Sequence, residues 1–269
     1  MPLPDRRLPA VVFFALALAG CGKQQGIKPP SGPLEVAPTY EARDNPEIRK
    51  RVNYQDQMVL AGESLRAGAP DAAEKRVRAA MKIDARRPEA YMLLAAIATQ
   101  RGNEAEAGRL YGKAAELGPG RGDVLNNYGA WLCAHGQPAE SLAWFDRALQ
   151  APGYTTPASA LANAGGCALD AGQPARAVRD LRRALEIDPV NAYALESMAR
   201  NEYAEGRYFE ARAFSQRRLT AAPATRSVLQ LASQIEARLG DSVASGRYLQ
   251  RIHDEFPQDA ALIPGVEAL

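Results

Sequence analysis

The stretch from Asn126 to Tyr154, NNYGAWLCAHGQPAESLAWFDRALQAPGY, predicts two amphipathic helices joined by a tight turn. In the first helix, Leu125, Tyr128 and Leu132 return at close to 3.6-residue intervals and therefore share one face. The segment Gly136–Pro138 suits the turn, because glycine relaxes the backbone at a helix C-terminus and proline is favoured at the start of the next helix.

The same pattern returns along most of the chain. The turn glycines follow one another at separations of 34, 36, 34 and 34 residues: Gly102, Gly136, Gly172, Gly206 and Gly240. A small residue recurs late in the second helix of each unit, at Ala80, Ala114, Ala148 and Ala184. A period of 34 residues with two helices per unit is the signature of the tetratricopeptide repeat.

This resemblance predicts an all-α chain, a right-handed superhelical solenoid of about six repeats. The repeats are expected near 54–87, 88–121, 122–155, 158–191, 192–225 and 226–259. The pair Thr156-Pro157 accounts for the single 36-residue step. The first and last repeats are atypical, with Ala85 where proline is usual and Ile252 where alanine is usual, as expected for units with one neighbour.

Composition and charge exclude several classes of protein. Apolar residues make up 46% of the 269 residues, which is enough for a sizeable core. A formal charge of +2 is not the footprint of a nucleic-acid-binding protein. Three cysteines and two histidines are few for a metal site built from these ligands. No metal, cofactor or small-molecule substrate is therefore expected.

The N-terminus predicts an exported lipoprotein. Arg6 and Arg7 precede the apolar run Leu8–Leu18, which is too short for a spanning helix and fits a signal peptide over residues 1–20. The sequence Leu18-Ala19-Gly20-Cys21 resembles a bacterial lipobox, which implies acylation of Cys21; the alternative is an ordinary secretory signal with an incidental cysteine. Gly22, in place of the aspartate that favours inner-membrane retention in such signals, implies the outer membrane, facing the periplasm.

The remaining boundaries follow from composition. Residues 21–46 are rich in proline and glycine and predict a flexible tether after the lipidated cysteine. Residues 47–259 form the expected repeat domain, and residues 260–269 a C-terminal tail.

Cys133 and Cys167 occupy the first helices of adjacent predicted repeats. In the oxidising compartment that export implies, they are candidates for a disulfide. The alternative is a pair of small buried apolar side chains.

No catalytic constellation is recognisable, so an enzyme is not expected. His135 lies in a turn, and His253 precedes the acidic pair Asp254-Glu255. Neither has a candidate nucleophile or metal-ligand set at recognisable spacing.

The resemblance to tetratricopeptide arrays instead implies a partner-binding groove lined by the first helices. The expected groove residues are Met58, Leu65, Met92, Asn126, Asn127, Ala130, Ala162, Asn163, Leu169, Tyr193, Arg200 and Tyr203. Asn127 and Asn163 hold equivalent places and could hydrogen-bond a ligand backbone, or serve as structural asparagines. Tyr193 and Ser197 stand where some relatives carry the basic residues of a carboxylate clamp, so that clamp is not predicted.

The chain also resembles the type IV pilus biogenesis and stability family PilF/PilW. The matching stretches are Asn126-Asn127-Tyr128-Gly129, Ala162-Asn163-Ala164-Gly165 and Tyr208-Phe209-Glu210-Ala211-Arg212. This resemblance implies a pilotin, an outer-membrane lipoprotein that binds the pilus secretin and promotes its localisation and multimerisation. The alternative is a periplasmic scaffold lipoprotein for outer-membrane protein assembly or for docking peptidoglycan enzymes.

Overall fold

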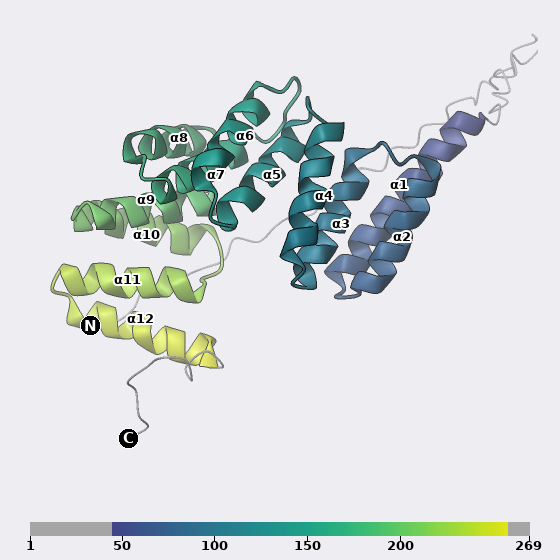
Figure 1. Cartoon of the computed structure of the whole chain (residues 1–269). Coiled ribbons are helices and arrows are strands. Elements are labelled where there is room, and N and C mark those ends of the chain that lie inside the picture. Colours follow the sequence, from purple (N-terminus) through teal and green to yellow (C-terminus); the bar gives the residue numbers. More distant parts are fainter. Residues whose placement is uncertain (1–44, 258–269) are drawn as a thin grey trace, which may run out of the picture. The chain divides into compact units, whose positions relative to one another are not determined.

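The computed structural model describes residues 45–257, and this part of the chain is a solenoid of six helix pairs (Figure 1). The all-α tandem-repeat architecture predicted from the 34-residue period is thereby confirmed. The twelve helices within these residues are α1 (Pro46–Arg66), α2 (Pro70–Ile83), α3 (Pro88–Gln100), α4 (Glu104–Leu117), α5 (Gly122–Ala134), α6 (Pro138–Gln150), α7 (Pro157–Asp170), α8 (Pro174–Ile187), α9 (Ala192–Ala204), α10 (Tyr208–Ala221), α11 (Arg226–Arg238) and α12 (Ser242–Glu255).

The turn within each pair is closed by a glycine in the left-handed region. Gly136 has φ +80° and Gly172 has φ +70°, a backbone conformation that a residue with a Cβ rarely adopts. Gly68, with φ +74°, closes the turn of the first repeat and lies 34 residues before Gly102. The first repeat therefore keeps the turn glycine of the series although its sequence is otherwise degenerate.

The connections between repeats locate the extra two residues. Four residues separate α4 from α5 and α8 from α9, whereas six residues, 151–156, separate α6 from α7. Pro157 is the first residue of α7, and Gly153, with φ +70°, lies inside the longer connection. The link between the third and fourth repeats is thus two residues longer than the other links between repeats.

The core is built from small side chains that face large ones. The recurrent alanines late in the second helices, among them Ala148 and Ala184, are fully buried. Gly129 on α5 lies against the Phe145 ring of α6, where a Cβ would stand 2.9 Å from Cε1. Because the glycine has no side chain, the two helices come close together, and the ring fills the space between them.

The two ends of the array differ from its middle. α1 begins at Pro46, with the Asn45 side chain accepting a hydrogen bond from the Glu47 backbone, so it extends about two turns before the first predicted repeat. No residue of α12 is buried. Terminal repeats have one neighbour, so they bury less surface than central ones.

The first helices of the pairs, α1, α3, α5, α7, α9 and α11, lie on the inner side of the array. Each consecutive pair of them has Cα atoms within 8 Å of one another. Within residues 45–257 no two second helices approach in this way, so the second helices diverge outward. The face formed by the first helices is therefore the concave one, and we call it the first-helix face.

Candidate functional site

The predicted groove residues fall into three groups by exposure. Tyr193 and Arg200 are exposed, whereas Asn126 and Ala162 are buried and offer little surface. The half-buried members are Met58, Leu65, Met92, Asn127, Ala130, Asn163, Leu169 and Tyr203. Fewer of the predicted groove residues are therefore accessible to a partner than the sequence suggested.

Three asparagines lie at the centre of the first-helix face. The Asn163 side chain of α7 donates from Nδ2 to Oδ1 of Asn126 on α5, at 3.0 Å. Asn163 therefore acts as a structural asparagine, the alternative to ligand binding that the sequence left open. Its hydrogen bond runs to the neighbouring repeat and not to its own helix. Asn127 is half-buried, and its side chain makes no hydrogen bond within residues 45–257, so its amide is available to a ligand.

Two adjacent glycines of α7 face different helices: Gly166 faces Tyr193 of α9, and Gly165 faces Leu181 of α8. A Cβ on Gly166 would stand 2.4 Å from the Tyr193 hydroxyl, and a Cβ on Gly165 would stand 2.5 Å from Leu181 Cγ. Burial against α7 raises the pKa of the Tyr193 phenol, so the hydroxyl stays protonated as a hydrogen-bond donor. Sequence analysis placed Tyr193 on this face, but the contact that orients its ring depends on the packing of α7 with α9.

Charged and aromatic groups follow towards the C-terminal end of the face. Arg200 of α9 donates from Nη2 to Asp170 Oδ1 of α7 at 3.0 Å. The Tyr203 and Tyr208 rings lie with centroids 5.6 Å apart. A hydrogen bond with Tyr203 raises the pKa of the Arg238 guanidinium. This half of the face is polar.

The first helix, α1, carries three exposed aliphatic side chains on one side. Ile48, Val52 and Val59 are 48%, 44% and 58% exposed and lie on one side of α1, at helical spacing. Gly62, on the same side, has no neighbour within 4 Å of an ideal Cβ. Sequence analysis did not single out these α1 side chains, although their spacing of four and seven residues was a readable signal.

Cys133 of α5 and Cys167 of α7 are joined by a disulfide in the structure, with Cα atoms 5.9 Å apart. Cys167 is buried, and the pair packs with Leu142, Phe145 and Ala130 between the third and fourth repeats. The disulfide links α5 to α7, the two helices that carry the asparagines of the first-helix face.

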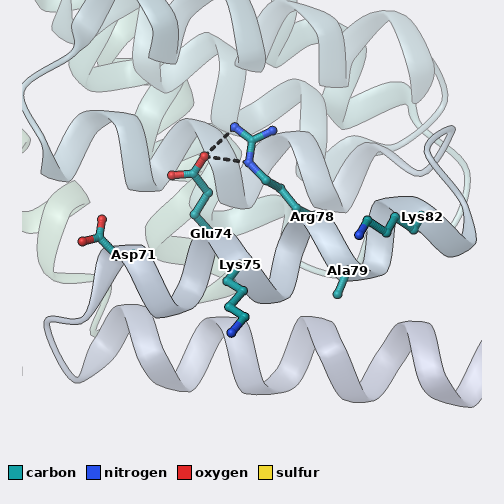
Figure 2. A pocket seen from close by; sticks show the side chains of 6 residues that line it. All are labelled: Asp71, Glu74, Lys75, Arg78, Ala79 and Lys82. Carbon is teal, nitrogen blue, oxygen red and sulfur yellow. Dashed lines mark hydrogen bonds and ion pairs between the residues drawn. The ribbon is translucent and has the colours of Figure 1, made fainter.

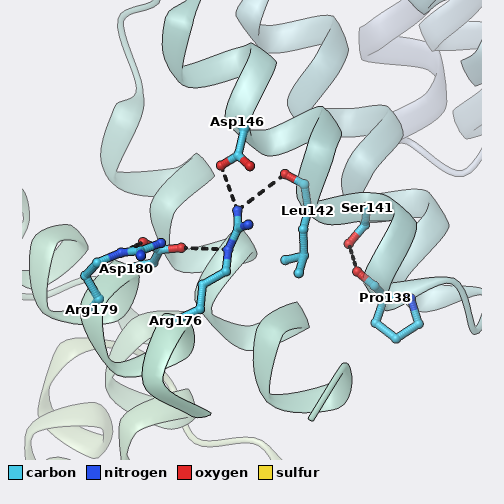
Figure 3. Close-up of polar contacts among 7 residues, drawn as sticks. All are labelled: Pro138, Ser141, Leu142, Asp146, Arg176, Arg179 and Asp180. Carbon is cyan, nitrogen blue, oxygen red and sulfur yellow. Dashed lines mark hydrogen bonds and ion pairs between the residues drawn. The ribbon is translucent and has the colours of Figure 1, made fainter. Parts of the chain in front are cut away.

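The outer side of the solenoid carries an ionic network that sequence analysis missed. Arg176 of α8 donates to Asp146 Oδ1 of α6 at 2.7 Å and to Asp180 Oδ2 at 3.3 Å (Figure 3). Its Nη2 also reaches the Leu142 carbonyl oxygen, at 3.4 Å. Arg179 donates to the second oxygen of Asp180 at 3.0 Å, so this buried carboxylate has two cationic partners.

A shallow hollow of about 510 Å³ lies on the outer face of α2 (Figure 2). Its lining is charged and has no aromatic side chain: Asp71, Glu74, Lys75, Arg78, Ala79 and Lys82. Arg78 and Arg101 both donate to Glu74, which lowers the pKa of that carboxyl. The hollow is a set of surface ion pairs rather than a reaction site.

The described residues carry no arrangement suited to metal binding or to crossing a bilayer. No group of three or more metal-ligating side chains occurs among residues 45–257. In the same range, no helix combines the length and the apolar character that a membrane span needs. The His135 ring stacks on Trp131, with Nδ1 2.7 Å from the Trp131 carbonyl oxygen and Nε2 2.8 Å from Glu104 Oε2. The predicted signal peptide, Cys21 and nearly all of the tether lie outside the described residues.

Comparison with known proteins finds solved structures that are similar to this array. No protein-family model and no curated protein sequence matches the chain. Among solved structures, the widely conserved type IV pilus biogenesis factor PilW is 28% identical, with a TM-score of 0.70, covering 78% of this chain and 96% of PilW. PilF from Pseudomonas aeruginosa is 22% identical, with a TM-score of 0.68, covering 78% of this chain and 94% of PilF.

This chain is a structural neighbour of PilW and PilF. A tetratricopeptide repeat protein from Parabacteroides merdae, 18% identical with a TM-score of 0.58, covers 76% of this chain and 80% of its own and shares the fold alone. The fold that they share with this chain is a tandem helical-repeat array, an architecture typical of protein-interaction scaffolds.

Proposed function

We propose that the chain acts in type IV pilus biogenesis as an outer-membrane lipoprotein, with Cys21 acylated and the solenoid facing the periplasm. The observation that carries the proposal is the match to PilW over 96% of that protein's chain at 28% identity. In this proposal the partner is the pilus secretin, and the role is that of a pilotin which promotes secretin localisation and multimerisation.

The first-helix face supports the binding of an extended or helical segment of the partner. At its centre the free Asn127 amide offers a donor and an acceptor, which matches the C=O and N–H of a peptide backbone. The small, half-buried Ala130 on the same helix leaves room for a backbone to approach. Backbone recognition of this kind tolerates many side chains in the bound segment.

Side chains of α1 and of the α7–α9 pair supply further contacts. The exposed Ile48, Val52 and Val59 offer apolar anchors on α1, and Arg200 with Asp170 offers charge on α9 and α7. A segment with apolar residues at one end and polar residues at the other would satisfy both halves. Burial of the three aliphatic side chains supplies the larger part of the affinity, because exposed ion pairs contribute little.

The anchor and the face act together in this mechanism. Several acyl chains hold a protein stably on a bilayer, so the partner segment is captured at the membrane where the secretin assembles. Tethering raises the effective concentration of the secretin there without requiring tight intrinsic binding.

Affinity capture from detergent-solubilised outer membranes tests the proposal. The lipidated protein should recover the secretin. Val59→Asn should reduce the recovery by removing an apolar contact. Asn127→Ala should reduce it by about tenfold, because the variant loses a hydrogen bond to the partner's backbone. Gln150→Ala, an exposed change on α6, is the matched control and should recover as much secretin as the native chain. Recovery of barrel-assembly or cell-wall enzymes without the secretin would replace the pilus role by a scaffold role in another envelope machine.

A further inference from the structure

The second helices carry a row of cations at one position of the repeat. Five successive repeats have a basic residue there, separated by 34, 36, 34 and 34 residues, and every one is exposed: Lys113, Arg147, Arg183, Arg217 and Arg251. Because equivalent positions in a solenoid face the same way relative to their neighbours, the row runs along the outer surface, away from the first-helix face.

The row is densest around α8. Arg179, Arg182 and Arg183 are all exposed on this helix, and Arg182 and Arg183 make no ion pair or hydrogen bond within residues 45–257. Arg147 on α6 and Arg217 on α10 flank them. We call these five side chains the α8 arginine face.

Hydrogen bonds link the three second helices of this face. Arg176 of α8 bonds to Asp146 of α6 at 2.7 Å. Arg217 of α10 donates to the carbonyl oxygen of Pro189, just after α8, at 3.0 Å. The cations therefore lie on successive linked helices of the outer side.

Acidic residues do not neutralise the face. Asp146 and the buried Asp180 are both engaged by Arg176, and Arg179 shares Asp180 (Figure 3). Glu186 is the exposed carboxylate of α8. Since the whole chain has a formal charge of only +2, the positive charge here reflects local placement and not an overall excess.

Exposed aliphatic side chains adjoin the arginines at the end of α8. Ile187 is 54% exposed and lies one helical turn after Arg183, and Val190 in the following turn is 66% exposed. Arginines beside exposed aliphatic groups match an anionic bilayer surface, where guanidinium groups pair with phosphates and aliphatic groups enter the acyl boundary.

We propose that the α8 arginine face, with Ile187 and Val190, is a peripheral contact site for an anionic phospholipid surface. An array of cations with a regular period suits a partner whose negative charge extends over a wide area, as lipid headgroups do. The contact lays the outer side of the solenoid on the membrane and leaves the first-helix face turned away from it. The site needs no secretin, so it stands or fails independently of the proposed function.

Vesicle co-sedimentation tests this site. The full chain carrying Cys21→Ala, which cannot be acylated, is mixed with vesicles of phosphatidylcholine alone or with about 30% phosphatidylglycerol. Binding should be stronger to the anionic vesicles and should fall with salt. Arg182→Gln with Arg183→Gln should reduce the anionic preference by roughly tenfold to thirtyfold, because each cation near such a surface contributes on the order of a factor of five. Val190→Ser should weaken binding that persists at high salt.

Lys75→Gln with Lys82→Gln, which removes the same charge from the outer face of α2, is the matched control and should keep the preference. All variants should keep the native melting temperature, since these side chains are exposed. Equal loss in the α8 and α2 variants, or equal binding to both vesicle types, would overturn the site. Binding to soluble polyglutamate with no binding to vesicles would overturn the lipid assignment.

Discussion

Gly166 of α7 lies directly beneath the ring of Tyr193 on α9, with room for no side chain between them. A Cβ at this glycine would stand 2.4 Å from the hydroxyl oxygen and 2.7 Å from Cζ. The ring is 41% exposed, so it can rotate outward if it is pushed. The position of Tyr193 on the first-helix face thus depends on the absence of a methyl group in the neighbouring repeat.

Gly166→Ala should therefore displace Tyr193 at a modest cost. We expect a loss of about 1 kcal/mol in unfolding free energy, because the ring can yield and alanine favours the helix. Gly165→Ala should cost more, about 2–3 kcal/mol, since its Cβ would meet the buried Leu181 and the Ala177 carbonyl oxygen. Gly246→Ala, with open space around its Cβ, is the control and should stabilise α12. Urea unfolding measures all three, and equal effects would contradict the packing.

Replacing both Cys133 and Cys167 with alanine should lower the free energy of unfolding. The bond closes a 34-residue separation, for which chain entropy predicts about 3–4 kcal/mol. Denaturant unfolding of the Cys21→Ala chain with and without dithiothreitol checks the value, and reductant should leave the double variant unchanged. A native-like stability after reduction would contradict the prediction.

Arg176→Met should destabilise the array by about 2–3 kcal/mol. The change leaves the buried Asp180 with Arg179 alone and removes the bridge to α6. Asp146→Ala should cost less than about 1 kcal/mol, because that side chain is 48% exposed. Arg183→Met is the control and should be neutral. Thermal unfolding of the three variants gives the ranking, and a larger effect for Asp146→Ala would refute it.

Glu74 should make stability depend on acidic pH. Hydrogen bonds from Arg101, and then from Arg78, lower its pKa in the folded state below the usual 4.5. Figure 2 shows the contact of Glu74 with Arg78. Its contribution is therefore fully present above about pH 4.5 and is lost as pH falls through the lower folded value. Glu74→Gln should flatten this part of the stability curve, measured by urea unfolding between about pH 3 and 6. Glu63→Gln, an exposed change on α1, should leave the slope unaltered.

The helix pairs were readable from the sequence because turn glycines and small core residues repeat with the solenoid itself. Gly102 and Gly136 have positive φ, as expected of the turn glycines that their 34-residue spacing indicated. Gly68 escaped notice because the first repeat lacks the proline that marks the others, although its distance to Gly102 is also 34.

The candidate site was less predictable because it depends on contacts between repeats. The bond of Asn163 to Asn126, and the bridge of Arg176 to Asp146, join side chains more than 29 residues apart whose register is set by helix packing. Sequence spacing placed Asn126 and Ala162 on the correct helices but did not reveal that the neighbouring helix covers them. The aliphatic stripe on α1 was visible as a pattern, yet its exposure depends on α1 being the first helix among residues 45–257.

The disulfide stands at the midpoint of the array, with three helix pairs on either side. Linear repeat arrays fray from their ends, so amide protons exchange with solvent soonest in terminal repeats. A covalent bond between the two central repeats stops fraying from both directions at the same place. Amide exchange should therefore be slowest in α5 to α8 of the oxidised chain, and reduction should speed exchange in these central helices while leaving exchange at the ends unchanged.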